Sequence, residues 1–237
     1  MKIEIMYPDL CCLYGDKGNT KFLMQCLPDA EFICTGLNEK PAFLDGDVDL
    51  CCMYSMSEQS QERILDRLMP YKAEIAAACK EGKTLFLLLG NALELFAQYI
   101  QREDGSKVTG LGVFETHTVR HAPNRFNTLI QARFENTTLL GYTSRFADTF
   151  GITEDIAFCR VEIGSGSDPK TKLEGIRSGR VIATYLLGPL LVANPDFSKW
   201  LLQQLGVENP ALPYEDALYL AYETKRKEFQ RSDLELD

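Results

Sequence analysis

Short apolar runs alternate with amphipathic stretches over the first hundred residues. The apolar runs predict four strands, at 2–6, 31–35, 48–53 and 84–89. Helical patterns lie between and after them, at 21–27, 57–69, 70–80 and 91–100. Short strands that are apolar throughout are typical of a parallel sheet with helices on both faces. Ser55 or Ser57 could cap the second helix, and Pro70 suits the first turn of the third.

The pattern becomes rich in strands from about residue 109 onward. Five further runs predict strands, at 112–118, 127–134, 137–142, 156–163 and 180–187, and two helices are expected at 195–206 and 213–230. Few helical intervals separate these strands, which indicates an antiparallel extension at one edge of the sheet. No Pro/Ser-rich linker or charge block divides the chain. We therefore expect a single α/β domain, 1–237, with a mostly parallel sheet.

Charge and hydropathy exclude two classes of partner. The net charge of −9 and pI near 4.9 argue against a surface that binds nucleic acid, and no Lys/Arg run contains interleaved aromatic residues. No apolar run approaches the roughly 18 residues of a membrane span. The first ten residues, MKIEIMYPDL, also lack the pattern of a signal peptide. We expect a cytoplasmic protein without a membrane span.

Neither the cysteines nor the histidines predict a metal site or a cofactor. Eight cysteines occur without any Cys-x-x-Cys spacing, and both vicinal pairs lie in apolar runs, where cysteine acts as a small hydrophobe. His117 and His121 are four residues apart, but their segment is predicted as strand and loop. An open alternative is that Cys52 or Cys79 pairs with one of these histidines as a nucleophile.

Three loops follow the carboxyl ends of predicted strands, where parallel sheets gather ligands. They read LYGDKGN at 13–19, YSMSEQSQ at 54–61 and LGN at 89–91. Taken alone none is specific, because their glycines can simply serve tight turns. The stretch 84–96, TLFLLLGNALELF, predicts a strand that turns sharply into a helix, which is a common place for a nucleophile.

Two longer segments carry a resemblance to a known family. The opening segment 7–19 reads YPDLCCLYGDKGN, and the closing segment 173–201 contains TYLLGPLLVANP. In both, the chain resembles class I glutamine amidotransferases of the cobyric acid synthase type, particularly the GatD-like amidase subunits of lipid II isoglutaminyl synthase. The resemblance implies a flavodoxin-like amidotransferase fold. It also implies a cysteine on the elbow and a histidine in the closing segment, which together hydrolyse glutamine.

Both reactive residues are replaced in this chain. The resemblance places Leu89 at the nucleophile position and Leu187 at the base position, so no catalytic residue is intact. We expect these two leucines to be in side-chain contact. Tyr54, Ser55 and Met56 stand where the family has a glycine-rich turn, and the bulky Tyr54 and Met56 are expected to fill the glutamine pocket. The segment 141–145 departs from the family pattern as well.

The remaining ligand-binding positions implied by the resemblance are Tyr54, Ser55, Gly90, Asn91 and Arg125. Arg125 lies where the family keeps a basic residue that meets the substrate carboxylate. The alternative for this arginine is an ordinary solvated position on a loop.

The function expected first is a non-catalytic amidotransferase-like protein that binds a protein partner or a glutamine-like small molecule. The resemblance implies a Mur-ligase-like subunit as that partner. One alternative is an enzyme that runs a different reaction in the same crevice, with Asp16, Glu94 or Arg125. Another is a sensor of an amino acid, which requires an open pocket.

Overall fold

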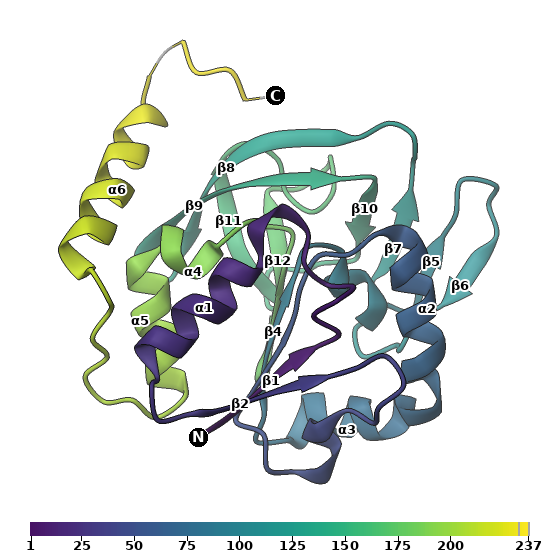
Figure 1. Cartoon of the computed structure of the whole chain (residues 1–237). Helices are drawn as coiled ribbons and strands as arrows, with labels where there is room; N and C mark the ends of the chain where they lie inside the picture. The colour runs from purple at the N-terminus through teal and green to yellow at the C-terminus, as the bar shows by residue number, and fades with distance from the viewer. Residues whose placement is uncertain (232, 237) are drawn as a thin grey trace.

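The main structural feature of the protein is a nine-stranded sheet (Figure 1). The structure is a computed structural model, which describes residues 1–231 and 233–236. In spatial order the strands of this sheet are β2 (Glu31–Thr35), β1 (Lys2–Met6), β3 (Leu50–Met53), β4 (Leu85–Leu89), β13 (Val181–Thr184), β12 (Leu173–Ser178), β11 (Ala157–Ile163), β8 (Phe126–Phe134) and β9 (Thr137–Arg145).

The first five strands in this order are parallel, and the four expected strands of the first hundred residues are confirmed. β4 lies between β3 and β13, with Leu50 opposite Leu85 and Thr184 opposite Leu89. All five residues of β4 are buried, which explains the uninterrupted apolar run. The carboxyl ends of β1, β3, β4 and β13 therefore meet at one edge of the sheet.

The other half of the sheet is antiparallel, from β13 through β12, β11 and β8 to β9. This confirms the antiparallel extension expected from the second half of the sequence. β12 was not among the expected strands. It pairs with β13 through the turn at Gly179, whose φ of +57° suits glycine.

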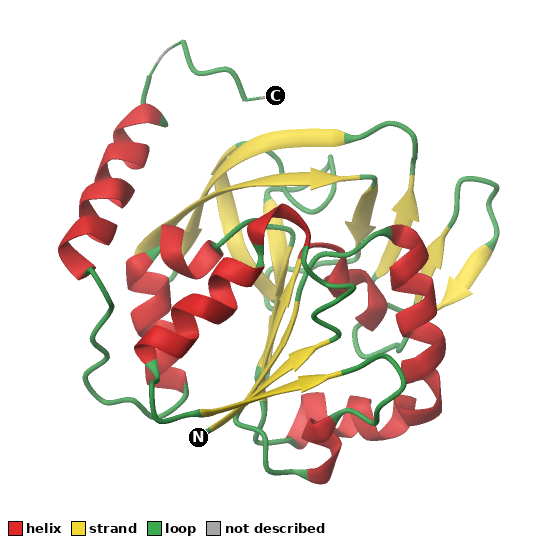
Figure 2. Cartoon of the chain, viewed as in Figure 1, coloured by secondary structure: helices red, strands yellow, loops and turns green. Residues whose placement is uncertain are grey.

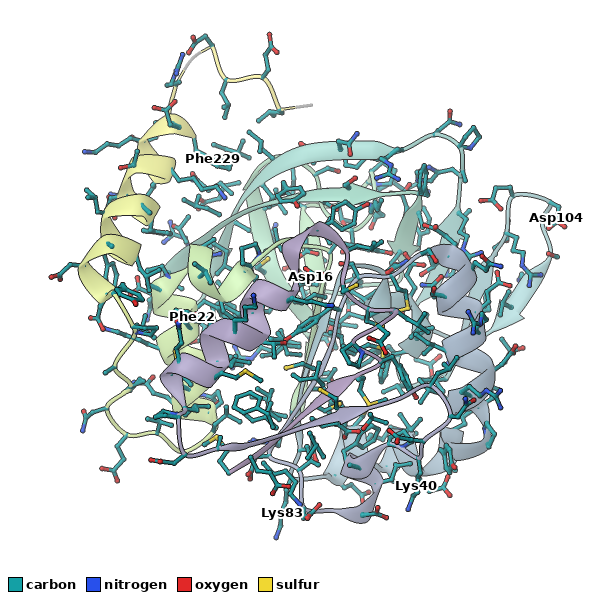
Figure 3. All side chains as sticks on the ribbon, viewed as in Figure 1. Asp16, Phe22, Lys40, Lys83, Asp104 and Phe229 are labelled. Atoms are coloured by element: carbon teal, nitrogen blue, oxygen red, sulfur yellow. The ribbon has the colours of Figure 1, made fainter. Side chains whose placement is uncertain are left out.

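Helices cover both faces of the sheet (Figure 2). They are α1 (Lys17–Cys26), α2 (Glu58–Leu68), α3 (Lys72–Glu81), α4 (Leu190–Ala193), α5 (Pro195–Gln204) and α6 (Glu215–Glu228). Figure 1 shows α1, α4 and α5 on one side and α2 and α3 on the other. Phe22, labelled in Figure 3, buries its ring beneath α1. Ser57 caps α2 by accepting a hydrogen bond from Ser60 N (3.2 Å).

A second, four-stranded sheet was not expected. It consists of β10 (Ala147–Phe150), β7 (His117–Arg120), β5 (Tyr99–Gln101) and β6 (Lys107–Thr109), in that order. The strand expected at 112–118 is therefore wrong for most of its length, since only its end enters β7.

The helix expected at 91–100 is also wrong. A 3₁₀ helix, η4 (Gly90–Phe96), follows β4, and the chain then enters β5. The backbone groups of residues 95–98 form hydrogen bonds with residues 110–116. For example, Gly112 N donates to Ala97 O (2.9 Å), and Gln98 N donates to Thr116 O (2.9 Å). These bonds outcompete continuation of the helix.

Among the described residues, no helix is both long enough and apolar enough to cross a bilayer.

Candidate functional site

The turn after β4 has its corner at Gly90. Leu89 keeps an ordinary extended backbone (φ −111°, ψ 144°), and its side chain is completely buried. Gly90 has a φ of +62°, in the left-handed region that favours glycine, and it begins η4. The sharp turn that a nucleophile elbow requires is thus made by Gly90, one residue after the position expected from the sequence.

The space beside Gly90 is already occupied. A Cβ atom built on Gly90 would lie 2.3 Å from Ser55 Oγ and 3.0 Å from Leu187 Cδ2. Leu187 reaches this point from the segment after β13, where its N–H donates to Tyr142 O (3.0 Å). A side chain at position 90 would therefore require Ser55 to move.

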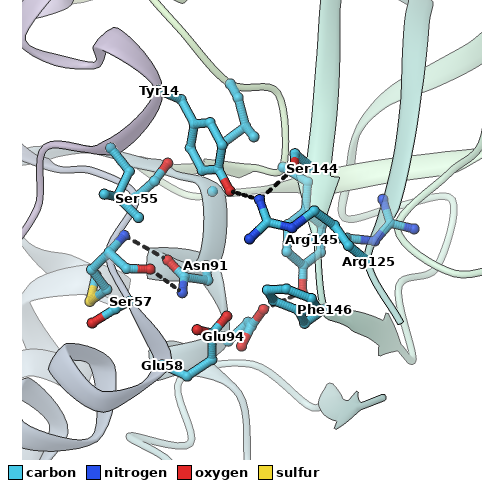
Figure 4. A pocket seen from close by; sticks show the side chains of 15 residues that line it. Tyr14, Ser55, Ser57, Glu58, Asn91, Glu94, Arg125, Ser144, Arg145 and Phe146 are labelled. Atoms are coloured by element: carbon cyan, nitrogen blue, oxygen red, sulfur yellow. Dashed lines mark hydrogen bonds between the residues drawn. The ribbon is translucent and has the colours of Figure 1, made fainter. Parts of the chain in front are cut away.

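A cavity of about 140 Å³ opens next to this corner (Figure 4). Its wall comes from the loops after β1, β3, β4 and β13 and from the region around Arg125 and β9. The lining residues are Leu13, Tyr14, Ser55, Met56, Ser57, Glu58, Gly90, Asn91, Glu94, Arg125, Ser144, Arg145, Phe146, Tyr185 and Leu187.

Four of the five expected ligand-binding residues line the cavity, namely Ser55, Gly90, Asn91 and Arg125. Tyr54 does not, and the expectation that it fills the pocket is wrong. Its ring is buried on the other side of the loop, where its hydroxyl is 3.0 Å from Thr20 Oγ1. Met56 and Leu187 do line the cavity, but they leave it open.

Asn91 holds the loop after β3 in place. Its Oδ1 accepts from Met56 N (3.0 Å) and its Nδ2 donates to Met56 O (2.8 Å). Both polar ends of the side chain are thus used within the protein. Asn91 shapes the wall of the cavity and has little hydrogen-bonding capacity left for a ligand.

Asp16 supports the same loop from behind. The carboxylate is completely buried at the start of α1, and Oδ2 accepts from Ser55 N (3.0 Å). Burial raises the pKa of Asp16 to about 6, against the opposing effect of hydrogen bonds from Ser55. Asp16 does not line the cavity, so its role here is to position Ser55.

Glu94 presents a buried carboxylate to the cavity. Oε1 accepts from the Tyr185 hydroxyl (2.9 Å), and Oε2 accepts from Gln61 Nε2 (2.9 Å). Burial raises the pKa of Glu94 to about 7, although these two hydrogen bonds and the charge of Arg120 act in the opposite direction.

A polar network extends from Glu94 to the second sheet. Gln61 Oε1 accepts from Arg120 Nη2 (2.7 Å), and Arg120 Nη1 donates to Glu62 (2.7 Å). Arg102 forms a bidentate pair with the same Glu62 (3.0 and 2.8 Å), which together with Arg120 holds the pKa of Glu62 down to about 2.

Arg125 lies at the outer side of the cavity. Nη1 donates to the Tyr14 hydroxyl (2.9 Å) and to Ser144 Oγ (3.2 Å), and the guanidinium stacks 4.4 Å from the Phe146 ring centroid. Figure 4 shows this guanidinium facing Glu58 and Glu94 across the cavity. The hydroxyl groups and the ring orient the cation without neutralising it.

The thiols do not offer a replacement nucleophile. Cys52 lies within β3 and Cys79 within α3, and burial raises the pKa of each to about 12. His117 is stacked between Tyr99 and Phe150 in the second sheet, whereas Cys52 lies in the nine-stranded sheet. Within residues 1–231 and 233–236, no three His, Cys, Asp or Glu side chains gather as a metal site would require.

Several cavity residues were not anticipated. Tyr14 belongs to a loop singled out in the sequence, and its φ of +55° turns the ring toward Arg125. Ser144 and Arg145 belong to the segment that departs from the family pattern. Tyr185 belongs to the closing segment that carries the resemblance, although it was not among the expected cavity residues. Phe146 carries no local signal, because only pairing between distant strands brings it to the cavity.

Comparison with known proteins identifies relatives of the same architecture. No model of a known protein family matches the chain. In sequence it is similar to subunit GatD of lipid II isoglutaminyl synthase (glutamine-hydrolyzing) from Staphylococcus aureus strain N315, at 24% identity over 208 residues, covering 86% of this chain and 83% of that protein.

Two solved structures from Thermotoga maritima have a similar fold. PurLQS matches with a TM-score of 0.54 and 13% identity over 78% of this chain and 86% of that one. A glutamine amidotransferase matches with a TM-score of 0.51 and 12% identity over 97% and 92%. The chain thus has the fold of class I glutamine amidotransferases. Within that class it is GatD-like, as a homologue of the staphylococcal subunit.

Proposed function

We propose that this chain is a glutamine amidotransferase-like subunit that does not hydrolyse glutamine and instead binds a protein partner and a small ligand. The observation that carries this proposal is the composition of the elbow. Leu89, Gly90 and Leu187 supply neither a thiol nor an imidazole, and the reaction requires both. Without them no acyl-enzyme can form and no proton can be moved to the leaving ammonia.

The position of the lost nucleophile is part of the proposal. The sequence resemblance places it at Leu89, but that side chain points into the core of the sheet and does not line the cavity. We assign it to Gly90, because of its positive φ and because its missing side chain would point at Leu187. The base position stays at Leu187.

The proposed partner is inferred from the staphylococcal protein to which the chain is similar in sequence. The staphylococcal protein is named as a subunit, and the resemblance implies a Mur-ligase-like protein as the other component. We propose a partner of that kind for this chain, in the cytoplasm. The cavity beside Gly90 supplies a separate place for a small ligand, with Arg125 available for a carboxylate.

A glutaminase assay tests the central claim. The purified chain, alone and with its co-purified partner and ATP, should release no ammonia from glutamine above background, while an active GatD-like subunit serves as the positive control. Loss of one member of a cooperating catalytic set typically costs on the order of a million-fold in turnover. Ammonia release that disappears in Cys52→Ser would refute the proposal.

Restoring the two reactive residues should not restore activity. In Gly90→Cys/Leu187→His the new Cβ would still lie 2.3 Å from Ser55 Oγ, so the thiol cannot take its place without rearrangement. Leu89→Cys/Leu187→His should also stay inactive, because position 89 is buried in the sheet. Measurable turnover in the Gly90 variant would show that the obstruction by Ser55 is not decisive, and turnover in the Leu89 variant would return the nucleophile position to Leu89.

A second candidate function rests on Glu94. A buried carboxyl group with a pKa of about 7, at the edge of a cavity, suits general acid–base catalysis near neutral pH. The chain would then be an enzyme for a different reaction. Incubation with a cytoplasmic metabolite extract, followed by mass spectrometry, would reveal a compound consumed by the native chain and spared by Glu94→Gln. If no compound differs between the two, this candidate fails.

A further inference from the structure

Two ionisable groups face the cavity without an oppositely charged partner bound to them among the described residues. One is the carboxylate of Glu94, whose hydrogen-bond donors are the neutral amide of Gln61 and the neutral hydroxyl of Tyr185. The other is the guanidinium of Arg125, whose acceptors are the hydroxyl groups of Tyr14 and Ser144. When Glu94 is ionised, the cavity therefore has a negative inner wall and a positive outer wall.

The neighbouring arginines are already engaged elsewhere. Arg120 pairs with Glu62 (2.7 Å), and Arg145 donates to Asp148 (3.1 Å) and to Gly166 O (2.9 Å). Neither guanidinium bonds to Glu94. Glu58, in the first turn of α2, adds a second carboxylate to the lining on the Glu94 side (Figure 4).

The guanidinium of Arg125, at the outer side of the cavity, is held in one orientation. Arg125 is an exposed residue, yet two hydrogen bonds and the Phe146 ring hold its guanidinium at the cavity. A carboxylate is the group that a guanidinium in this geometry recognises best. Because Arg125 and Glu94 stand on opposite sides in Figure 4, one ligand that meets both must carry its two charges well apart.

We propose that the cavity binds an amino acid with a cationic side chain, such as lysine, with the cationic end at Glu94 and the carboxylate at Arg125. This inference rests on the proposed function, because it names the small ligand of the same cavity. It differs from glutamine, whose neutral carboxamide would leave the inner carboxylate without a counter-charge.

Calorimetric titration with lysine, ornithine, arginine and glutamine tests the proposal on the full chain. Lysine or another of the cationic amino acids should bind at least about tenfold more tightly than glutamine, as expected for a charge-assisted contact. Glu94→Gln should weaken that binding about tenfold and leave glutamine unchanged. Glutamine binding as tightly as every cationic amino acid would overturn the proposal.

A matched probe separates the two ends of the ligand. Cadaverine is lysine without its carboxylate, so its binding should be weakened by Glu94→Gln and unchanged by Arg125→Gln. Lysine binding should be weakened about tenfold by either change. Arg125 is exposed, so Arg125→Gln keeps the test available even if Glu94→Gln does not fold. Equal losses of cadaverine and lysine in Arg125→Gln would contradict the assignment of the outer end.

The pH dependence adds a readout that a purely structural role of Glu94 would not produce. The charged or titratable groups around this carboxylate are Glu58, Arg120, Arg125, Arg145 and Tyr185. Lysine stays cationic over the whole range. With the pKa of Glu94 at about 7, affinity should rise roughly tenfold from pH 6 to pH 8 and be flat in Glu94→Gln. A flat profile in the native chain would count against the proposal.

The titrations with glutamine also distinguish a failure of the proposed function from a failure of the proposed ligand. Ammonia appearing in them would mean that the proposed function is wrong. No ammonia together with no binding of any cationic amino acid would leave that function standing and remove this inference alone.

Discussion

At the scale of single residues, Gly90 decides what this elbow can do. Its positive φ makes the corner, and the lack of a side chain allows Ser55 Oγ and Leu187 Cδ2 to close over it. The same contact explains why the two neighbouring segments fit together. A side chain here is excluded twice, by backbone conformation and by space.

Gly90→Ala should lower the free energy of unfolding by about 2 to 4 kcal/mol, as the sum of the left-handed backbone cost and the clash with Ser55. Chemical denaturation measures this loss. Gly105→Ala is the control, because Gly105 has a φ of +83° but nothing within 4 Å of its added Cβ, so about 1 kcal/mol is expected. Equal losses at the two positions would show that Ser55 yields easily.

The raised pKa of Glu94 predicts how the stability of the chain depends on pH. The folded chain keeps the Glu94 proton up to pH about 7, whereas the unfolded chain loses it near 4.5. Between these values the folded state binds more protons, so its stability should fall as pH rises, by roughly 3 kcal/mol, and level off above pH 7. The raised pKa of Asp16 acts in the same direction.

Denaturation curves from pH 4.5 to 8 check this slope, with Glu94→Gln as the comparison. The variant should show a shallower decline, because only the contributions of Asp16 and of Glu174, whose pKa burial also raises, are left. A native chain whose stability increases across this range would contradict the burial of an unpaired carboxyl at position 94.

At the scale of elements, the opening and closing segments serve the fold through direct contact. Asn19 in α1 donates to Gly188 O (3.1 Å) and accepts from Leu191 N (3.0 Å). A Cβ on Gly18 would come 2.8 Å from Pro189 Cβ, which shows how closely α1 approaches the closing segment. Residues of the opening and closing segments that match the family pattern thus contribute to packing, independently of any catalytic role.

Asn19→Ala should cost about 2 to 4 kcal/mol, because it leaves two buried backbone groups without partners. The fall in thermal midpoint measures the effect. Asn38→Ala, at an exposed loop position, should change stability by less than about 0.5 kcal/mol. A small effect at Asn19 would show that water or a local shift replaces its bonds.

The elements differed in how far the sequence could predict them. β1, β3 and β4 were predictable because parallel strands that are buried along nearly their whole length read as apolar runs. β2, at the edge of the sheet, is only partly buried but still contains the apolar residues Phe32 and Ile33. The helical reading of 91–100 failed because a short 3₁₀ turn followed by a three-residue strand has no period of its own. β12 was missed since Glu174 and Arg177 interrupt its apolar pattern, although Glu174 is satisfied inside by Thr184 and Tyr185.

The site was predictable only in part, for a related reason. Ser55, Gly90 and Asn91 follow strand ends, so sheet topology alone brings them together. The sequence placed the corner at Leu89 instead of Gly90, because an apolar run does not reveal which residue has a positive φ. The contacts of Arg125 with Tyr14 and Ser144 join three distant segments and require the antiparallel pairing to be known.

At the scale of the whole molecule, the proposed partner is the feature open to direct test. Affinity purification at native abundance should recover a Mur-ligase-like protein, and size-exclusion chromatography should place both chains in one complex. The double variant Gly90→Cys/Leu187→His should retain the partner, because those positions lie inside the cavity. A chain that elutes alone from fresh lysate, with nothing bound, would argue strongly against a subunit role.

The contact between Ser55 and the bare corner at Gly90 has an evolutionary consequence. Once glycine stood at the corner, the hydroxyl of Ser55 could settle within 2.3 Å of the vacant side-chain position. A later mutation that returns a side chain to position 90 then meets an occupied space and is removed by selection on stability. On the proposal that the elbow has lost its nucleophile, the order of substitutions is constrained, because Ser55 must change before Gly90 can be replaced, and Leu187 must change as well before glutamine can be hydrolysed.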